Sequence, residues 1–320
     1  MDNVLFKRVS KKLRSGLSEE GMTGFDMHFH TRYSWDGMSL IPNVMKKAHK
    51  KGIGVAITDH NKIRGATACQ NNRYKVPIIP GVEITCKEGT HMLMYFYSHN
   101  ELREFFTKHI MPGMKTNPFA APVTVQELLE LSKDYNCINS AAHPFAPGVT
   151  GIKHLEVTTK MKKQLNQVEV INGYNTHLMN INAMIWANEI NKHPTGGSDG
   201  HTTSELGGVL TFVNGTTPEE VLTAVKKNQS RVVGKEENLL KKLILAIEKE
   251  GLFIKRSKMH HKAKLLLKTQ FGNEYNYIKE KVKNKRSHKI RHFRKRHVQP
   301  HAPNHNMEDL MFHNKRAEEK

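Results

Sequence analysis

The chain has 320 residues and a formal net charge of +20, with 50 Lys and Arg against 30 Asp and Glu. This length allows one large α/β domain with an appendage or two ordinary domains, and the basic balance predicts a partner of opposite charge. Three widely spaced cysteines exclude a disulfide framework and a Cys-x-x-Cys metal site. No apolar run approaches the roughly 20 residues that span a bilayer, and residues 1–23 lack the apolar stretch of a signal peptide. We therefore expect a cytoplasmic protein.

Residues 1–23 form a basic N-terminal leader whose weak amphipathic pattern predicts a short helix outside the core. Apolar and polar residues then alternate over 25–30, and this period of two predicts a β-strand with two different faces. One face would carry Phe25, Met27 and Phe29, and the other Asp26, His28 and His30. Two imidazoles on the same side of a strand end can bind one cation. Asp36 follows in the next loop.

The chain then alternates between helix and strand. His60 follows one buried strand, Glu83 lies within the apolar run of the next, and His91 precedes a third. We expect Asp59 to fix the tautomer of its neighbour His60. These elements are helices over 43–51 and near 65–73, and strands over 53–57, 76–84 and 92–97.

The alternation continues after an irregular stretch over 100–123. Thr124 and Glu127 form a capping box at the start of a helix, and His143 follows the next strand. A later strand leads to Asp199 and His201. The expected elements are helices over 125–135, 177–191 and from Thr217, and strands over 137–142, 167–171, 195–198 and 209–213. Residues 231–234 close the domain.

Such an order predicts a mainly parallel sheet, and about seven βα units would curl it into a barrel with its chemistry at the carboxyl ends of the strands. Nine candidate ligands lie at or beside such ends: His28, His30, Asp36, His60, Glu83, His91, His143, Asp199 and His201. Nitrogen and oxygen ligands without thiolates suit Zn²⁺, Mn²⁺ or Fe²⁺. The set would hold two or three ions, and Glu83 is the expected bridge because a buried unpaired carboxylate is costly.

The ligands lie in a series of short motifs in a characteristic order. These are Phe25-Asp-Met-His-Phe-His-Thr with Ser34-Trp-Asp-Gly, Ile57-Thr-Asp-His-Asn, Pro80-Gly-Val-Glu-Ile, His91-Met-Leu-Met-Tyr, Ala142-His-Pro-Phe and Gly197-Ser-Asp-Gly-His. In this combination the sequence resembles the PHP (polymerase and histidinol phosphatase) family of metal-dependent phosphoesterases. Some members of that family have His where this chain has Asp36.

The resemblance implies a distorted (βα)7 TIM-like barrel over residues 24–235 with a trinuclear metal centre. It implies that His28, His30, Glu83 and Asp199 hold one ion. It further implies that Glu83, His91 and His143 hold a second ion, and that Asp36, His60 and His201 hold a third.

Ions in this arrangement activate a water for attack on a phosphoryl group. The expected catalytic residues are therefore Glu83, which bridges ions, and Asp199 or His201, either of which could carry the proton of the leaving alcohol. Arg32 and Arg64 follow ligand-bearing strands and are candidates for binding the substrate phosphate, although each could equally be a surface charge.

Residues 236–320 form a basic C-terminal extension with 22 basic and 10 acidic residues. An amphipathic helix is expected over 238–254, which could pack on the barrel, on a partner or, less favourably, on a membrane surface. A weaker apolar pattern covers 265–282. The basic run over 283–296 is typical of a disordered tail and also of nucleic-acid binding.

The leading interpretation is a phosphoesterase acting on a phosphomonoester or nucleotide. An exonuclease or RNA-end processing enzyme, which would hold RNA or DNA through the basic extension, is the alternative. A non-catalytic, metal-stabilised nucleic-acid-binding module is a third possibility, and the intact ligand set argues against it. The sequence does not predict an oligomeric state.

Overall fold

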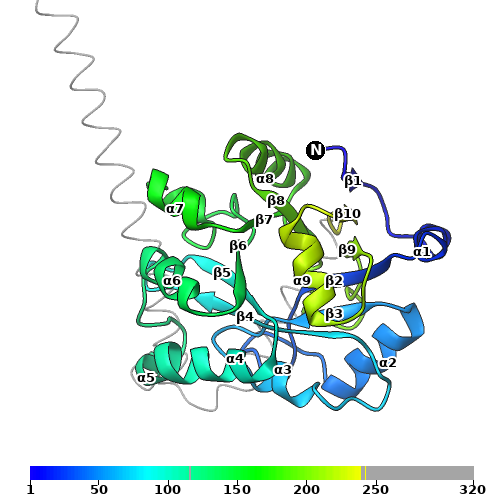
Figure 1. Cartoon of the computed structure of the whole chain (residues 1–320), viewed down its shortest axis with the longest axis horizontal. Coiled ribbons are helices and arrows are strands. Elements are labelled where there is room, and N and C mark those ends of the chain that lie inside the picture. The colour runs from blue at the N-terminus through cyan, green and yellow to red at the C-terminus, as the bar shows by residue number, and fades with distance from the viewer. Residues whose placement is uncertain (115–116, 239–241, 243–320) are drawn as a thin grey trace, which may run out of the picture. The chain divides into compact units, whose positions relative to one another are not determined.

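In the computed structural model of the protein, residues 1–114, 117–238 and 242 are described. This part of the chain forms one sheet with helices around it (Figure 1). The strands are β1 (Val4–Phe6), β2 (Thr23–Phe29), β3 (Gly54–Ile57), β4 (Ile78–Thr85), β5 (His91–Phe96), β6 (Cys137–Ala141), β7 (Gln167–Asn172), β8 (His193–Gly197), β9 (Val209–Val213) and β10 (Ser230–Gly234).

The α-helices are α1 (Lys11–Glu19), α2 (Ile41–Lys51), α3 (Arg64–Ala68), α4 (His99–Phe105), α5 (Met111–Met114), α6 (Val125–Leu131), α7 (Thr159–Gln164), α8 (His177–Glu189) and α9 (Pro218–Lys226). A π-helical turn covers Phe106–Ile110, and 3₁₀ turns cover Ser132–Asp134 and Ile152–His154. Among the described residues, no helix has the length and apolar character needed to cross a membrane.

The strands follow the order β1-β10-β9-β2-β3-β4-β5-β6-β7-β8. Strands β2, β3 and β4 are parallel, as are β6, β7 and β8, which confirms the mainly parallel sheet. Strand β5 runs antiparallel between the two groups. Only residues 86–90 join β4 to β5, and a parallel crossover needs a dozen or more residues. The short link therefore makes a hairpin.

Strands β2 to β8 form a nearly closed barrel because the chain leaving β8 meets β2. The Asp199 N–H donates to the His28 carbonyl at 2.8 Å, and the His30 N–H donates to the Gly200 carbonyl at 2.9 Å. Gly197 permits this approach, since a Cβ there would lie 2.4 Å from the backbone nitrogen of His28. The expected distorted (βα)7 barrel is confirmed.

Helix α9 covers the end of the barrel at which the strands begin. Phe25 and Tyr95 inside the barrel belong to one buried cluster with Val221 and Val225 of α9. In Figure 1, α9 lies across the middle of the strands while α2 to α8 lie around them. The opposite end, where the parallel strands finish, is left for the polar residues.

A β-bulge in β2 interrupts the alternation of side chains that the sequence predicts. Phe25 and Asp26 pair with Gly54 and Val55, whereas Phe29 pairs with Ile57, so β2 carries one extra residue. Phe25 and Met27 consequently lie in the cluster inside the barrel, and Phe29 packs in the other cluster, under the helices. The expectation that all three share one face is wrong, because one extra residue moves every later side chain to the other face.

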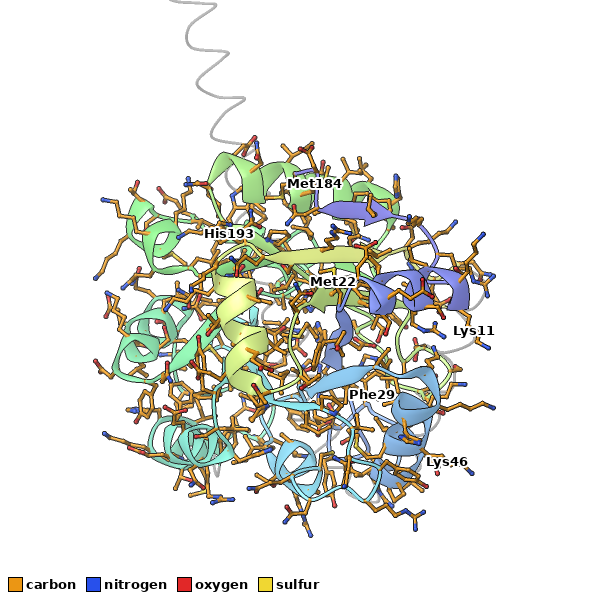
Figure 2. The ribbon with its side chains drawn as sticks, turned by 45° about the vertical axis from the view of Figure 1, so that its right-hand side comes forward. Lys11, Met22, Phe29, Lys46, Met184 and His193 are labelled. Carbon is orange, nitrogen blue, oxygen red and sulfur yellow. The ribbon has the colours of Figure 1, made fainter. Side chains whose placement is uncertain are left out.

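The N-terminal leader contains the expected helix, but it does not lie outside the core. Strand β1, which was not predicted, pairs in parallel with β10, and Leu17 of α1 is buried. Figure 2 shows Lys11 of α1 and Lys46 of α2 on the outside, with Phe29 in the interior. A strand of three residues is too short to show a period in the sequence.

The predictions for the C-terminal extension fall mostly outside the described residues. The patterns over 265–282 and 283–296 lie wholly outside, and of the predicted helix over 238–254 only residues 238 and 242 are described.

Candidate metal centre

The structure brings the nine predicted ligands together at the carboxyl end of the barrel. His28 lies in β2 and Glu83 in β4, and the other ligands lie just beyond β2, β3, β6 and β8. His91 begins β5 instead of ending it. Since β5 is antiparallel to its neighbours, its first residue lies at the same edge as their last ones.

The first group of ligand atoms surrounds Glu83 Oε2 and Asp199 Oδ1. His28 Nε2 lies 3.3 Å from Glu83 Oε2 and 3.4 Å from Asp199 Oδ1. His30 Nε2 lies 3.2 Å from each of these oxygens. Four side chains, two from strands β2 and β4 and two from the segments that follow β2 and β8, thus point at a common space.

A second group surrounds the other oxygen of Glu83. His91 Nδ1 lies 3.0 Å and His143 Nε2 lies 3.2 Å from Glu83 Oε1. The two oxygens of this one carboxylate therefore face different sets of imidazoles, which is the geometry expected of a bridging ligand.

A third group surrounds Asp36. His201 Nε2 lies 2.8 Å and His60 Nε2 3.7 Å from Asp36 Oδ2, while the Ser34 hydroxyl donates to Asp36 Oδ1 at 2.7 Å. The other nitrogen of His60, Nδ1, lies 3.1 Å from Glu83 Oε2. His60 therefore stands between this group and the first one.

The contacts of Glu83 fit a metal better than they fit hydrogen bonding. Its Oε2 is buried and makes no hydrogen bond within the described part of the chain, although His28, His30 and His60 each place a nitrogen within 3.3 Å of it. Buried polar atoms are normally hydrogen-bonded. An oxygen surrounded by nitrogens without a hydrogen bond is typical of ligands that converge on a cation, and the nitrogen and oxygen donors suit Zn²⁺, Mn²⁺ or Fe²⁺.

The buried charged groups strongly shift one another's pKa values. Burial opposes ionisation of Glu83 and Asp199, but the histidines around them outweigh it and hold both pKa values well below the usual range. Burial also disfavours protonated His30, yet Asp199 and Glu83 raise its pKa to about 10. At His60 burial dominates and lowers the pKa to about 3. Protons on imidazoles thus balance negative charge that divalent cations would otherwise balance.

A second buried carboxylate, Glu169 of β7, was not predicted. Its Oε1 lies 3.0 Å from His28 Nδ1, and its Oε2 accepts the backbone N–H of His143 at 2.8 Å. It therefore orients one ligand and fixes the backbone of another. Glu169 lies in the apolar run Val168-Glu-Val-Ile, which is the same signal that marked Glu83.

Asp59 does not have the predicted role. Its carboxylate accepts the Thr31 N–H at 2.6 Å and the Thr31 hydroxyl at 2.8 Å. It thus anchors the start of the loop that carries Asp36. Asp26 has a similar task, because it accepts the Ser198 and Gly207 N–H groups at 2.9 and 2.7 Å and so holds the loop of Asp199 and His201.

Two of the ligands have a backbone conformation that side chains rarely adopt. The φ angle is 25° at His143 and 51° at Asp199, both in the left-handed region. Such strain persists where the surroundings fix it and is common at functional sites. It turns each side chain sharply at the end of its strand.

Arg32 and Arg64 are exposed on the segments that follow β2 and β3. The guanidinium of Arg64 lies 5.3 Å above the ring of Tyr33, in the loop between His30 and Asp36. Both arginines are thus near ligand-bearing segments, and their contact with a phosphate remains a prediction.

Comparison with known proteins identifies the fold. The family model of the PHP domain matches residues 26–298. Among solved structures, an Endonuclease Q complex with a 27-mer duplex substrate carrying an abasic lesion is 19% identical with a TM-score of 0.55, covering 67% of this chain and 60% of that one. A lesion-specific endonuclease from Pyrococcus furiosus is 18% identical with a TM-score of 0.54, covering 66% of this chain and 57% of that one.

A two-domain protein from Bacteroides vulgatus, which contains a PHP-like metal-dependent phosphoesterase, is 17% identical with a TM-score of 0.51, covering 71% of this chain and 70% of that one. No curated protein sequence matches the chain. In the structural comparison, this chain covers about 60% of the length of each of the two endonucleases. Because the family model covers most of the sequence, and its motifs supply the convergent ligands, the chain belongs to the PHP domain family.

Proposed function

We propose that the protein hydrolyses a phosphomonoester or nucleotide at a centre that binds two or three divalent ions of Zn, Mn or Fe. As a member of the PHP family it is a hydrolase acting on phosphoester bonds. The observation that carries the finer proposal is the double role of Glu83, whose two oxygens face separate groups of imidazoles. In this proposal each ion has the ligands that the family resemblance implies.

The bound ions would supply positive charge for the phosphoryl oxygens and a water of lowered pKa. Glu83 would hold neighbouring ions, and His28 is kept in its orientation by Glu169. In this proposal either Asp199, whose side chain is 13% exposed, or His201, which is held against Asp36, carries the proton of the leaving alcohol. A cysteine nucleophile is not needed, and burial raises the pKa of the Cys69 thiol to about 12.

A nuclease activity is the second candidate, because unpaired cations line two adjoining hollows of the surface. Arg8 lines both a hollow of about 380 Å³ beside α1, with Lys7 and Lys12, and one of about 550 Å³ beside the loop after β8, with Lys235. Carboxylates share these hollows: Glu20 lines the first, and Glu205, Glu236 and Glu237 line the second. Within the described residues none of these four cations lies in an ion pair. Exposed cations along a groove suit a phosphate backbone, and Endonuclease Q was solved with duplex DNA.

One set of assays separates these candidates. The protein loaded with Mn²⁺ or Zn²⁺ is tested on p-nitrophenyl phosphate, bis(p-nitrophenyl) phosphate, nucleoside mono- and bisphosphates, end-labelled RNA and duplex DNA with an abasic site. Turnover of the monoesters supports the first proposal, and cleavage of the diester and nucleic acids supports the second. Elemental analysis should find two or three ions per chain. Metal content without turnover of any substrate would favour a binding module.

A further inference from the structure

Asn172, the last residue of β7, has a fully buried side chain beside the metal centre. Its amide Nδ2 donates to Glu169 Oε2 at 3.0 Å and to Asp199 Oδ2 at 3.2 Å. Its Oδ1 accepts the Tyr174 N–H at 2.8 Å and the Asn175 N–H at 3.2 Å. One side chain therefore joins two carboxylates to the loop that follows β7.

The two carboxylates that Asn172 joins lie on either side of His28. The other oxygen of Glu169 lies 3.0 Å from His28 Nδ1, and the other oxygen of Asp199 lies 3.4 Å from His28 Nε2. Asn172 thus binds the rear oxygen of each carboxylate and leaves the front oxygen directed at the imidazole. The amide group of this single residue thus bridges the two carboxylates.

The backbone of Asn172 is held independently of its side chain. Its N–H donates to Asn180 Oδ1 at 3.1 Å, and its carbonyl accepts from Asn180 Nδ2 at 3.1 Å. The Gly173 N–H donates to the Gly197 carbonyl at 3.1 Å. A change of the side chain should therefore leave the end of β7 in place while it removes the link between Glu169 and Asp199.

We propose that Asn172 is a positioning residue of the metal centre: its amide fixes Glu169 and Asp199 relative to each other, and through them His28 and the first ion. The inference rests on the proposed function of that centre. A neutral amide suits the position because it offers two donors to two carboxylates without adding charge. An aspartate there would place a third buried carboxylate against the first two, and an apolar residue would remove the donor to Asp199 Oδ2 and leave Glu169 Oε2 with only the His143 N–H.

The test compares Asn172→Leu with Asn175→Leu. Asn175 lies in the same loop, and its side-chain amide donates to Asn180 without contacting a carboxylate of the centre. Affinity for Co²⁺ is measured by competition with a chelator, and the visible absorption of bound Co²⁺ reports ligand geometry. We expect Asn172→Leu to bind the tightest ion at least tenfold more weakly with a changed spectrum, and to lose kcat more than it changes KM. Asn175→Leu should keep the wild-type affinity and spectrum.

As a control for folding, thermal unfolding of both variants is measured without metal. If Asn172→Leu does not fold, Asn172→Ser replaces it in the comparison. Serine retains one donor in a smaller side chain, so we expect a smaller loss of Co²⁺ affinity. A wild-type Co²⁺ affinity and spectrum in the folded Asn172 variant would overturn the inference. If the wild-type protein itself bound no Co²⁺, the proposed function would fail first, so the two failures are distinguishable.

Discussion

Glu83 is the residue on which the proposed chemistry of this centre depends most. It lies in the interior of β4, its side chain is 1% exposed, and it is within 3.3 Å of nitrogens from five histidines. A buried carboxylate in that position is costly unless cations surround it. The burial of this carboxylate among histidines therefore supports a role in binding cations and not in packing.

Replacing Glu83 with Gln should abolish phosphoester hydrolysis while the fold is kept, since the amide has nearly the same shape and cannot bridge two cations. We expect a loss of more than tenfold in kcat, which corresponds to more than about 1.4 kcal/mol of transition-state stabilisation. Turnover of p-nitrophenyl phosphate is measured beside the control Glu130→Gln, which removes an exposed surface carboxylate. A Glu83→Gln enzyme with more than a tenth of the wild-type rate would exclude the bridging role.

The stability of the metal-free protein should fall as pH rises from 7 to 9.5. The pKa of His30 is raised to about 10 in the folded protein, and an unfolded histidine titrates near about 6.5. Its stabilising contribution is therefore complete below about pH 6.5 and is lost as pH rises toward 10. Metal ligation requires the neutral imidazole, so the metal-loaded protein should not show this loss. Thermal unfolding with and without chelator tests this prediction, and a metal-free Tm that rises over the same range would contradict it.

At the scale of elements, the end of β7 joins the barrel to the first residues of the C-terminal extension. The Glu237 N–H donates to the Gly173 carbonyl at 2.9 Å, and Lys242 Nζ donates to the Asn175 carbonyl at 2.6 Å. Glu236 Oε2 lies 3.5 Å from Nδ1 of His177, at the start of α8. The same loop holds Asn172, so the extension begins in contact with the segment that supports Asp199.

Truncation after Lys235 should therefore weaken the metal centre, whereas truncation after Glu250 should not. The two hydrogen bonds are worth about 1 kcal/mol each, whereas the exposed pair of Glu236 and His177 adds little, which predicts a fall in Tm of about 4 to 8 °C for a domain of this size. Turnover of a small phosphoester and retention of metal on gel filtration are measured for both truncated proteins. The double variant Glu236→Gln, Lys242→Ala isolates two of the contacts. Equal Tm and turnover for the two truncations would show that these contacts are unimportant.

The sequence predicted the ligand-bearing elements well for a physical reason. Histidines and carboxylates at the ends of apolar strands have few other uses, so His28, His60 and Asp199 stand out. The bulge in β2 could not be read, because an extra residue leaves the local alternation unchanged and shows only in the pairing with β3. The sequence did not indicate a role for Asn172 at the site, since asparagine at a strand end is typical of ordinary turns.

At the scale of the whole molecule, positive charge is divided between the barrel and the extension. The extension carries 22 basic and 10 acidic residues in 85 positions, whereas residues 1–235 carry 28 and 20. The barrel cations Lys7, Arg8, Lys12 and Lys235 lie in no ion pair within the described part and line the two hollows, together with four carboxylates. Both regions are therefore candidates for binding a phosphate backbone, and they can be tested separately.

If the extension contacts about five phosphates of single-stranded RNA, log K should fall with log salt at a slope of about −3.5. Truncation after Glu250 should flatten this slope and leave turnover of p-nitrophenyl phosphate within about twofold, since the nine ligands lie before that point.

Neutralising Lys7, Arg8, Lys12 and Lys235 to Ala in the truncated protein should remove the remaining salt dependence if the hollows also bind RNA. Matched neutralisation of Lys133, Lys163, Lys226 and Lys227, exposed cations elsewhere on the barrel, controls for net charge. Binding is measured by fluorescence anisotropy between 50 mM and 200 mM salt. An unchanged slope after truncation would exclude the extension as a nucleic-acid-binding segment, and equal effects of the two sets of four substitutions would show that the barrel acts only through its total charge.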